Sequence, residues 1–533
     1  MLARSRVRGG GVADGMRVLI FHGYLLRGTG SNVYNASLAP ALAGLGHGVH
    51  VLCQDRDAGE LPWVNRVGSW TEGSLRVEDA GAAPSEATGS VTVYTPDLGG
   101  LLPVYVYDRY EGIYVKTFAD LTDGELDAYL SANVDAVTDV VRLAGGVDAA
   151  LANHLVMGPA ILARAGIPFA AKIHGSALEF TVRPNPERFL PYAREGVDAA
   201  AGILVGSRHT AEVLCETLPD HGLAAKTRLG PPGVDTTLFA PRSAREGVDE
   251  VGSFARELAA RGGAGEWGEN AAEASAALER WGDADGPRVV FVGKLIGSKG
   301  LDLLLGAWPL VVRSHPGARL LVIAFGEGAG VIDALLAALE AGDLDRAREL
   351  AAEGMVTTDA ESVPLRMLDM FLAAAPGDYP DAARAAARSV CIAGRLEHDE
   401  VARVLPAADA LVFPSTFPEA FGMVAAEAAA CGVLPVSADH SGAREVSRAL
   451  APALPPETRG LLSFPIGDGA VEAIADRLDR WLATDPDVRN RTREALSSRV
   501  RELWSWESVA EGVIAASQGR LGELPTVPED GRE

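Results

Sequence analysis

The sequence predicts an α/β protein of two doubly wound, Rossmann-like domains that face each other across a cleft. At 533 residues, the chain is too long for a single hydrophobic core. Two separate stretches alternate short apolar strands with helical segments, a pattern typical of parallel sheets. Ligands of such sheets bind at the carboxyl ends of the strands, so two facing domains predict a binding site between them.

The first series of strands and helices occupies residues 16–240, which we assign to the N-terminal domain. A strand at 17–21 (RVLIF) leads into a loop with Gly28, Thr29 and Gly30. Behind this loop the alternation predicts helices at 31–45, 123–143 and 209–218, and strands at 49–53, 148–152, 168–173 and 202–205. Residues 1–15 carry three arginines but no apolar stretch, so we expect a disordered leader and not a secretory signal.

The second series occupies residues 287–485, which we assign to the C-terminal domain. Strands are expected at 288–292, 319–324, 390–393, 410–413 and 433–437, with a helix at 300–313. Four segments lie outside the alternation: an exposed, partly helical linker or insert at 241–286, a helical insertion at 327–388, terminal helices at 486–518 that cross back to the first domain, and a disordered tail at 519–533.

Charge and cysteine usage exclude several classes of function. The net charge of −24 predicts a surface that repels nucleic acid and anionic membranes. The longest apolar stretch, 420–438, contains Glu427 and is broken by glycine and proline, so it does not read as a membrane span. The four cysteines form no C-x-x-C pair, and Asp55-Arg56-Asp57 reads as a solvated turn, so no metal site is expected. These features favour a cytoplasmic protein with reduced thiols and no stable membrane binding.

The most specific motif is the segment PEAFGMVAAE at 418–427, which follows a predicted buried strand. Its loop contains Glu419, and the helix behind it presents N–H groups that suit a diphosphate or sugar hydroxyls. Glu427 lies inside an otherwise apolar helix, where a buried carboxylate needs a partner. A ribose diol would satisfy it, and the alternative is a structural hydrogen-bond network.

Two lysines follow the first strand of the second domain in the segment VGKLIGSKG at 292–300. Lys294 and Lys299 can clamp a diphosphate and neutralise the charge that grows on it as a leaving group. The alternative for a single lysine is an exposed surface turn.

Polar residues also mark the carboxyl edge of the first sheet. His174 follows the strand at 168–173. Asn153-His154 ends the neighbouring strand and is a weaker candidate for the acceptor site. A lone histidine is often structural, but the position of His174 faces the predicted cleft. The glycine loop at 28–30 can form an anion nest, and it lacks the full G-x-G-x-x-G of nicotinamide dehydrogenases.

Taken in order, these motifs resemble the E-x₇-E signature of retaining family-four glycosyltransferases, which have the GT-B fold. The segments LGPPGVD at 229–235 and WESVA at 506–510 resemble two further family segments, and the likeness covers roughly residues 16–240 and 287–518. Lys294 stands where the family usually has arginine, and a lysine contacts phosphate as a point charge without the bidentate fork of arginine.

The resemblance implies a role for each motif. Glu427 would hold the nucleotide ribose, while His174 would contact the donor sugar near its reacting carbon. Lys294 and Lys299 would hold the diphosphate, and the loop of Gly28, Thr29 and Gly30 would approach it from the other domain. Glu419 would hold the donor sugar together with the backbone of the three residues that follow it, Ala420, Phe421 and Gly422.

The family reaction implies a retaining, metal-independent transfer of a hexosyl group from a nucleotide sugar to an acceptor bound on the side of the N-terminal domain. Two alternatives stay open: a nucleotide-sugar epimerase on the same fold, and a non-catalytic nucleotide-sugar-binding protein. The sequence names neither donor nor acceptor. Acceptor choice is expected to depend on loops at 59–114 and 179–188, in which no pattern is legible.

Overall fold

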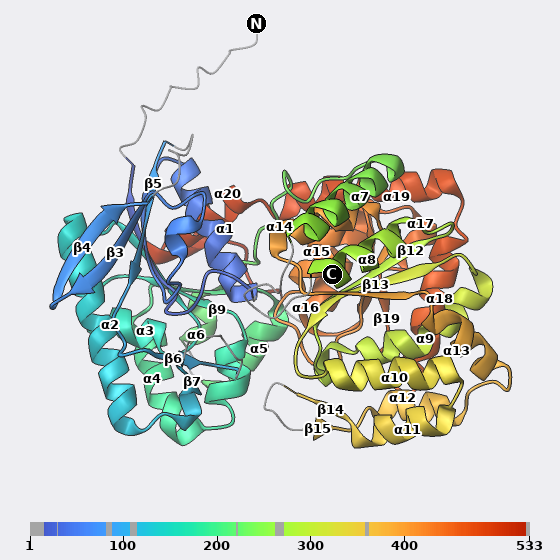
Figure 1. Ribbon diagram of the computed structural model, residues 1–533. Coiled ribbons are helices and arrows are strands. Elements are labelled where there is room, and N and C mark those ends of the chain that lie inside the picture. The colour runs from blue at the N-terminus through green and yellow to red at the C-terminus, as the bar shows by residue number, and fades with distance from the viewer. Residues whose placement is uncertain are drawn as a thin grey trace, which may run out of the picture.

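The computed structural model describes residues 15–28, 30–80, 88–106, 114–219, 222–261, 271–357 and 362–528. Figure 1 shows two lobes, each with a twisted sheet flanked by helices, which we call the N-domain and the C-domain. The predicted leader lies outside the described residues except for Gly15, and so does Thr29.

The N-domain is built on a nine-stranded sheet with the order β11-β10-β9-β8-β1-β2-β5-β3-β4. All neighbouring strands in it run parallel except β3 and β4. Its strands are β1 (Arg17–Phe21), β2 (Gly48–Leu52), β3 (Arg66–Thr71), β4 (Ser74–Asp79), β5 (Ser90–Thr95), β8 (Ala149–Asn153), β9 (Ala170–Ile173), β10 (Gly202–Val205) and β11 (Thr227–Leu229). The helices are α1 (Gly30–Gly44), α2 (Asp123–Ala144), α3 (Gly158–Arg164), α4 (Pro186–Ala199), α5 (Arg208–Thr217) and α6 (Leu223–Lys226).

The segment at 59–114, which we expected to be loops, contains three of these strands. β3 and β4 are largely exposed, so they lack the apolar run that marks a buried strand. A short separate pair, β6 (Leu101–Val104) and β7 (Tyr114–Thr117), completes this region. The expectation was therefore wrong for the strand residues of the segment.

The C-domain has a six-stranded parallel sheet with the order β16-β13-β12-β17-β18-β19. Its strands are β12 (Arg288–Lys294), β13 (Arg319–Phe325), β16 (Val390–Gly394), β17 (Ala410–Phe413), β18 (Leu434–Ala438) and β19 (Ser463–Phe464). The helices around it include α9 (Leu301–Ser314), α14 (His398–Val404), α15 (Met423–Ala430), α16 (Ser441–Leu450), α17 (Pro456–Arg459) and α18 (Ala470–Leu482). Two parallel sheets in two domains confirm the predicted architecture.

The segment at 241–286 is partly helical, as we expected of a linker or insert, but its helices are not simply exposed. It forms α7 (Ala244–Arg261) and α8 (Ala271–Gly282), which pack against each other and, through α8, against β16. Phe254 and Trp281 are fully buried in the same core as the C-domain strands. The Ala- and Glu-rich composition concealed an apolar stripe with helical spacing.

The segment at 327–388 forms four helices and a hairpin between β13 and β16. These are α10 (Ala329–Ala341), α11 (Leu344–Glu353), β14 (Met355–Val356), β15 (Ser362–Val363), α12 (Arg366–Ala373) and α13 (Tyr379–Ala387). The helices gather beside α9 at the lower edge of the C-domain in Figure 1.

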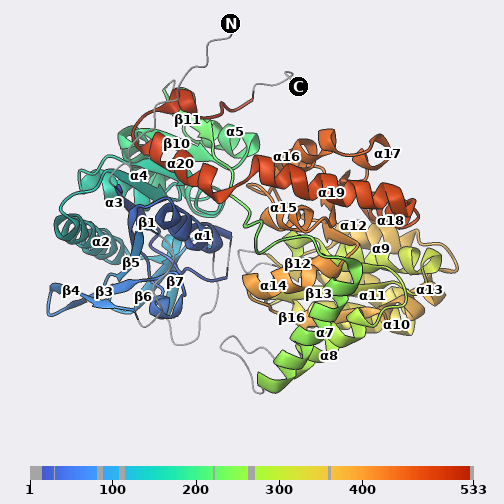
Figure 2. The same cartoon turned by 90° about the horizontal axis from the view of Figure 1, so that it is seen from above.

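The chain returns to the N-domain after α19 (Pro486–Leu503). Figure 2 shows α20 (Trp506–Ser517) lying on the N-domain beside α1, where the Trp506 ring packs on Tyr34 with centroids 5.5 Å apart. Val234 N–H donates to the Trp504 carbonyl at 2.8 Å, so the outward and return crossings are joined. The expected disordered tail is ordered as far as residue 528, because Leu229 N–H bonds to the Pro525 carbonyl at 2.9 Å and Arg228 pairs with Thr526.

A carboxylate from the C-domain closes the start of an N-domain helix. Glu445 of α16 accepts hydrogen bonds from the backbone N–H groups of Arg208 and His209, at 2.8 and 3.1 Å. Free N–H groups at a helix start are a natural site for an anion. This contact ties the two domains together beside the cleft.

Candidate active site between the domains

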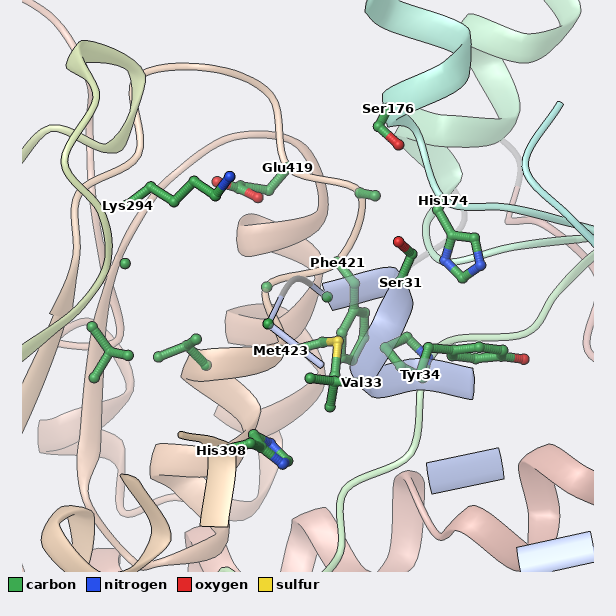
Figure 3. A pocket seen from close by; sticks show the side chains of 18 of the residues that line it. Ser31, Val33, Tyr34, His174, Ser176, Lys294, His398, Glu419, Phe421 and Met423 are labelled. Atoms are coloured by element: carbon green, nitrogen blue, oxygen red, sulfur yellow. The ribbon is translucent and has the colours of Figure 1, made fainter. Parts of the chain in front are cut away.

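A cavity of about 460 Å³ lies between the domains and is lined by the predicted motifs of both. Figure 3 shows Lys294 and Glu419 on the C-domain side and Ser31, Tyr34 and His174 on the N-domain side. Because the strands of each sheet end at this cleft, the observed position is the one that doubly wound folds favour.

Lys299 and Glu419 form an ion pair at the base of the C-domain wall. The Lys299 Nζ lies 2.6 Å from the Glu419 Oε1. Burial alone would raise the pKa of Glu419, but the Lys299 ammonium and hydrogen bonds from Lys299 and Ser415 hold that pKa below its usual value. The carboxylate is therefore charged at neutral pH, and the lysine keeps two further N–H donors for a ligand.

The loop that carries Glu419 is fixed by a group of polar side chains. Ser415 Oγ donates to Glu419 Oε1 at 2.7 Å, and Glu419 N–H donates to Ser441 Oγ at 2.8 Å. His440 bonds to both serines, at the Ser415 carbonyl and the Ser441 hydroxyl. The carboxylate is thus held in place before any ligand binds, as an electrostatic site requires.

Two glycines let these loops approach closely. Gly300 has φ +68°, and a Cβ there would stand 2.0 Å from the Pro414 carbonyl oxygen. Gly422 has φ +107° and precedes α15. Both conformations disfavour any other residue, so the sequence can present Lys299 and the start of α15 to the same space.

Glu427 is buried in α15, as predicted, and pairs with a histidine that the sequence did not reveal. His398 Nε2 lies 2.8 Å from Glu427 Oε1. Burial alone would lower the pKa of His398, but the charge of Glu427 and the hydrogen bond to it raise that pKa above its usual value. The alternative role of Glu427, a structural hydrogen bond, is therefore present for its Oε1 atom.

A second cation, Arg395, accompanies Lys294 near the ends of β12 and β16. The Lys294 Nζ and the Arg395 guanidinium lie 5.8 and 5.1 Å from the centre of the Phe325 ring. Arg395 is buried and also pairs with Glu397 at 2.8 Å. The cleft thus has a guanidinium as well as the two predicted lysines.

The glycine loop of the N-domain approaches the C-domain from the opposite side. A Cβ on Gly28 would stand 3.6 Å from an Arg395 nitrogen, and one on Gly30 would stand 3.6 Å from the Met423 sulfur. The start of α1 therefore lies close to the start of α15 across the cleft. Thr29, the third predicted residue of this loop, lies outside the described residues.

His174 lines the cavity at the end of β9, where the sequence placed it. Its Nε2 lies 2.7 Å from Asn153 Oδ1, while the Asn153 amide nitrogen donates to the Phe21 carbonyl and to Asn35. Burial lowers the pKa of His174 well below its usual value, so the ring is neutral. Nε2 is then the protonated nitrogen, since the Asn153 oxygen can only accept.

The remaining predicted residues lie where their motifs placed them. Ala420, Phe421 and Gly422 line the cavity, and the Phe421 ring packs edge-on against Trp504. A smaller cavity of about 190 Å³ adjoins the first one, and His174, Lys299, Glu419 and Ala420 line both. These four residues therefore stand at the junction of two spaces.

Sequence reasoning missed Arg395, His398, Ser415 and His440, although one signal could have found them. Each follows the carboxyl end of a predicted C-domain strand within a few residues, which is where ligand-binding loops of this architecture lie. The loop after β16 matches none of the segments that carry the family resemblance, so the resemblance implied no role for its residues.

Within the described ranges, no three His, Cys, Asp or Glu side chains are grouped so that they could hold a metal ion. The metal-independent mechanism stays a prediction. The prediction of a solvated turn at 55–57 is wrong for Asp55. Its side chain is buried and accepts hydrogen bonds from the backbone N–H groups of Leu26 and Asp57. The four cysteines are free thiols. None of the described helices combines the length and apolarity that a membrane crossing needs.

Comparison with known proteins finds one family model and several relatives that match parts of the chain. Residues 381–500 match the family model "Glycosyl transferases group 1". A D-inositol 3-phosphate glycosyltransferase of Segniliparus rotundus is 28% identical over 233 residues, which is 44% of this chain and 40% of that protein. A protein of the same description from Mycobacterium bovis is 30% identical over 127 residues, 24% of each chain. The matches span less than half the length of either relative.

Solved structures share the whole fold at low identity. Anabaena HepE in complex with UDP-glucose aligns with a TM-score of 0.55 and 15% identity, covering 95% of this chain and all of that one. Sucrose-phosphate synthase from Thermosynechococcus elongatus aligns with a TM-score of 0.53 and 17% identity, covering 95% of this chain and 98% of that one. The chain therefore has the GT-B fold, as the sequence predicted.

Proposed function

We propose that this chain is a retaining, metal-independent glycosyltransferase that moves a hexosyl group from a nucleotide-sugar donor to an acceptor. One observation carries the proposal: Lys299, Glu419 and Glu427 line one wall of a single cleft, and His174 lines the other. The relatives are named as glycosyltransferases, and a solved neighbour was crystallised with UDP-glucose.

The donor's nucleotide is assigned to Glu427 and its neighbours. The His398 hydrogen bond engages Oε1 of Glu427, so we assign the second oxygen to a ribose hydroxyl. A charged carboxylate binds such a hydroxyl more strongly than a neutral group would. The diphosphate is assigned to the start of α15, the glycine loop, and the cations Lys294, Lys299 and Arg395.

The hexosyl group is assigned to the junction of the two cavities. There Glu419 and the backbone of residues 420–422 would hold its hydroxyls, next to His174 on the opposite wall. As the glycosidic bond breaks, negative charge grows on the leaving diphosphate, and preorganised cations stabilise that charge. The departing phosphate would help to deprotonate the acceptor on the same face of the sugar, which gives retention.

A screen of nucleotide sugars by thermal stabilisation tests the donor site, because a bound ligand raises stability by mass action. We expect at least one UDP-, GDP- or ADP-sugar to raise the Tm, and no stabilisation by any of them would overturn the proposal. Turnover of that donor with and without acceptor separates the alternatives: an epimerase converts the donor alone, and a non-catalytic binder leaves it intact.

Metal removal provides a separate test of the mechanism. We expect transfer in excess chelator to match transfer with added magnesium, because lysine and arginine side chains take the place of a metal ion at the diphosphate. A large loss of rate that a divalent ion restores would contradict this.

The proposed setting is the cytoplasm, with a soluble acceptor. The net charge of −24 disfavours stable binding to anionic membranes and nucleic acid. Co-sedimentation with anionic vesicles at physiological salt would contradict the absence of membrane binding.

A further inference from the structure

His154 is a buried histidine on the N-domain wall of the cleft, and its ring nitrogens are unpaired within the described residues. It is 1% exposed, and neither ring nitrogen has a hydrogen-bond partner among the residues that the structure describes. An unsatisfied buried polar group costs about 1–3 kcal/mol, and native structures contain few of them. Because His154 also lines the cavity, a ligand in that cavity can supply the missing partners.

The backbone at His154 is held in an unusual conformation. Its φ is +68°, just after β8, and its N–H donates to the Lys172 carbonyl at 2.8 Å. Few residues other than glycine adopt positive φ, and strained residues of this kind gather at functional sites. The positive φ and the unpaired ring nitrogens are thus two independent observations that favour a functional role for the His154 side chain.

Aromatic rings surround the imidazole. The Tyr105 ring centre lies 4.3 Å from that of His154, and the His22 ring stacks on the His154 ring with centres 5.9 Å apart. Tyr24 and Tyr105 also line the cavity. An apolar, aromatic wall with a few fixed polar groups is the usual construction of a pocket for a small molecule.

The polar groups of this wall are mostly uncharged. Burial lowers the pKa of His154 well below its usual value, and burial also lowers the pKa of His22 to about 4. The one lysine or arginine among the described N-domain residues of the cavity is Lys172, whose pKa burial lowers to about 7. Its ammonium already donates to the Gly230 carbonyl, so this wall offers little attraction to a phosphate.

We infer that His154 binds a hydroxyl of the acceptor, and that the acceptor is an uncharged polyol or sugar. A neutral imidazole has one donor and one acceptor nitrogen, which matches a hydroxyl group that also donates and accepts. The His154 ring centre lies 4.9 Å from that of His174, so a hydroxyl held there lies beside the assigned donor sugar. This inference rests on the proposed function and adds the acceptor's chemical class to it.

The test uses the full chain and the nucleotide sugar that stabilises it most. Release of the nucleoside diphosphate is measured with glycerol, glucose, mannose and myo-inositol, and with glucose 6-phosphate and myo-inositol 3-phosphate. We expect an uncharged compound to accelerate release in the wild type. In His154→Phe, which removes both nitrogens, the acceptor KM should rise about tenfold or more, as the loss of one to two hydrogen bonds predicts. The donor KM should change by a smaller factor than the acceptor KM.

His47→Phe is the matched control, because His47 lies in the same domain outside the cleft and should leave every parameter unchanged. If His154→Phe fails to fold by circular dichroism, Tyr105→Leu removes the adjacent ring and should raise the acceptor KM in the same way. An unchanged acceptor KM in the folded variant overturns the inference. So does a wild type that responds only to the phosphorylated compounds, or to none of the panel. A wild type that binds no nucleotide sugar would instead overturn the proposed function.

Discussion

The two walls of the cleft differ in charge and in how they are built. The C-domain wall carries Lys294, Lys299 and Arg395 together with the carboxylates Glu419 and Glu427, and two of these groups pair at 2.6 Å. The N-domain wall carries neutral imidazoles and tyrosines. Charge is concentrated on the side assigned to the diphosphate, where it changes during the reaction, and is sparse on the side assigned to the acceptor. The contrast indicates that the proposed donor and acceptor sites differ in electrostatics.

The largest effect is expected from removing charge at the centre of the C-domain wall. Lys299→Ala should lower kcat by ~10²–10³, because one preorganised partner of the leaving group is lost, and should weaken donor binding less. The measurements are kcat and donor KM on protein shown by circular dichroism to be folded. Arg245→Ala, at a side chain that is 92% exposed, is the control for simple loss of a cation. A kcat within roughly threefold of the parent would remove Lys299 from the mechanism.

A smaller effect is expected from Glu427, which we assign to the nucleotide ribose and not to the reacting bond. Glu427→Gln keeps the shape of the side chain but removes the charge that we assign to the ribose. A hydrogen bond to a charged group contributes ~1.5–3 kcal/mol, so the nucleotide Kd should rise by about tenfold or more, as calorimetry with the nucleoside diphosphate can measure. Exposed Glu472→Gln is the control in the same domain. An unchanged Kd in folded protein would exclude the ribose role.

The contact that holds the two walls together should matter still less. Glu445→Ala removes the carboxylate that closes the start of α5. Loss of a helix cap costs about 1 kcal/mol, which corresponds to roughly fivefold in the balance between closed and open forms. We expect a higher donor KM and a larger radius of gyration by small-angle X-ray scattering. Glu212→Ala, on α5 itself, should change neither, and an unchanged radius in Glu445→Ala would show that other contacts hold the domains.

The smallest effect is a pH dependence of stability, which tests whether the His398–Glu427 pair stabilises the C-domain wall. The pKa of His398 is raised in the folded protein above its ordinary value of about 6.5. Its pairing with Glu427 therefore stabilises the fold fully below that ordinary value, and this contribution is lost as pH rises through the folded pKa. The Tm difference between wild type and His398→Gln should be largest in mild acid and shrink in mild base. A difference independent of pH would mean that the histidine acts only by packing.

The same contrast explains which parts could be predicted from the sequence. The C-domain motifs are contiguous, so Lys299, Glu419 and Glu427 could be read from single segments, and strands such as β1 and β17 were predicted with the bounds that the structure has. The N-domain wall combines ends of strands and loops far apart in the chain. His154 was only a weaker candidate, because nothing in the sequence shows that its nitrogens lack partners.

Where the prediction failed, the residues were individually unremarkable. α7 and α8 are rich in alanine and charge, and only the burial of Phe254 and Trp281 shows that they belong to the core. Arg395 and His398 can be recognised as cleft residues only from their tertiary neighbours, Gly28 and Glu427. Such pairings depend on tertiary contacts between segments that are distant in sequence.

The return of α20 to the N-domain has a consequence for how the protein is made. The core of this domain contains residues from both parts of the chain, including Val18 and Leu38 early on and Val513 and Ile514 near its other end. During synthesis, domains usually fold as units in the order in which they emerge from the ribosome. Here the part of the N-domain core that contains α20 residues cannot close until α20 has been translated, after the whole C-domain. The domain that is translated first is therefore completed last, and its apolar α20-binding face stays open to chaperones in the meantime.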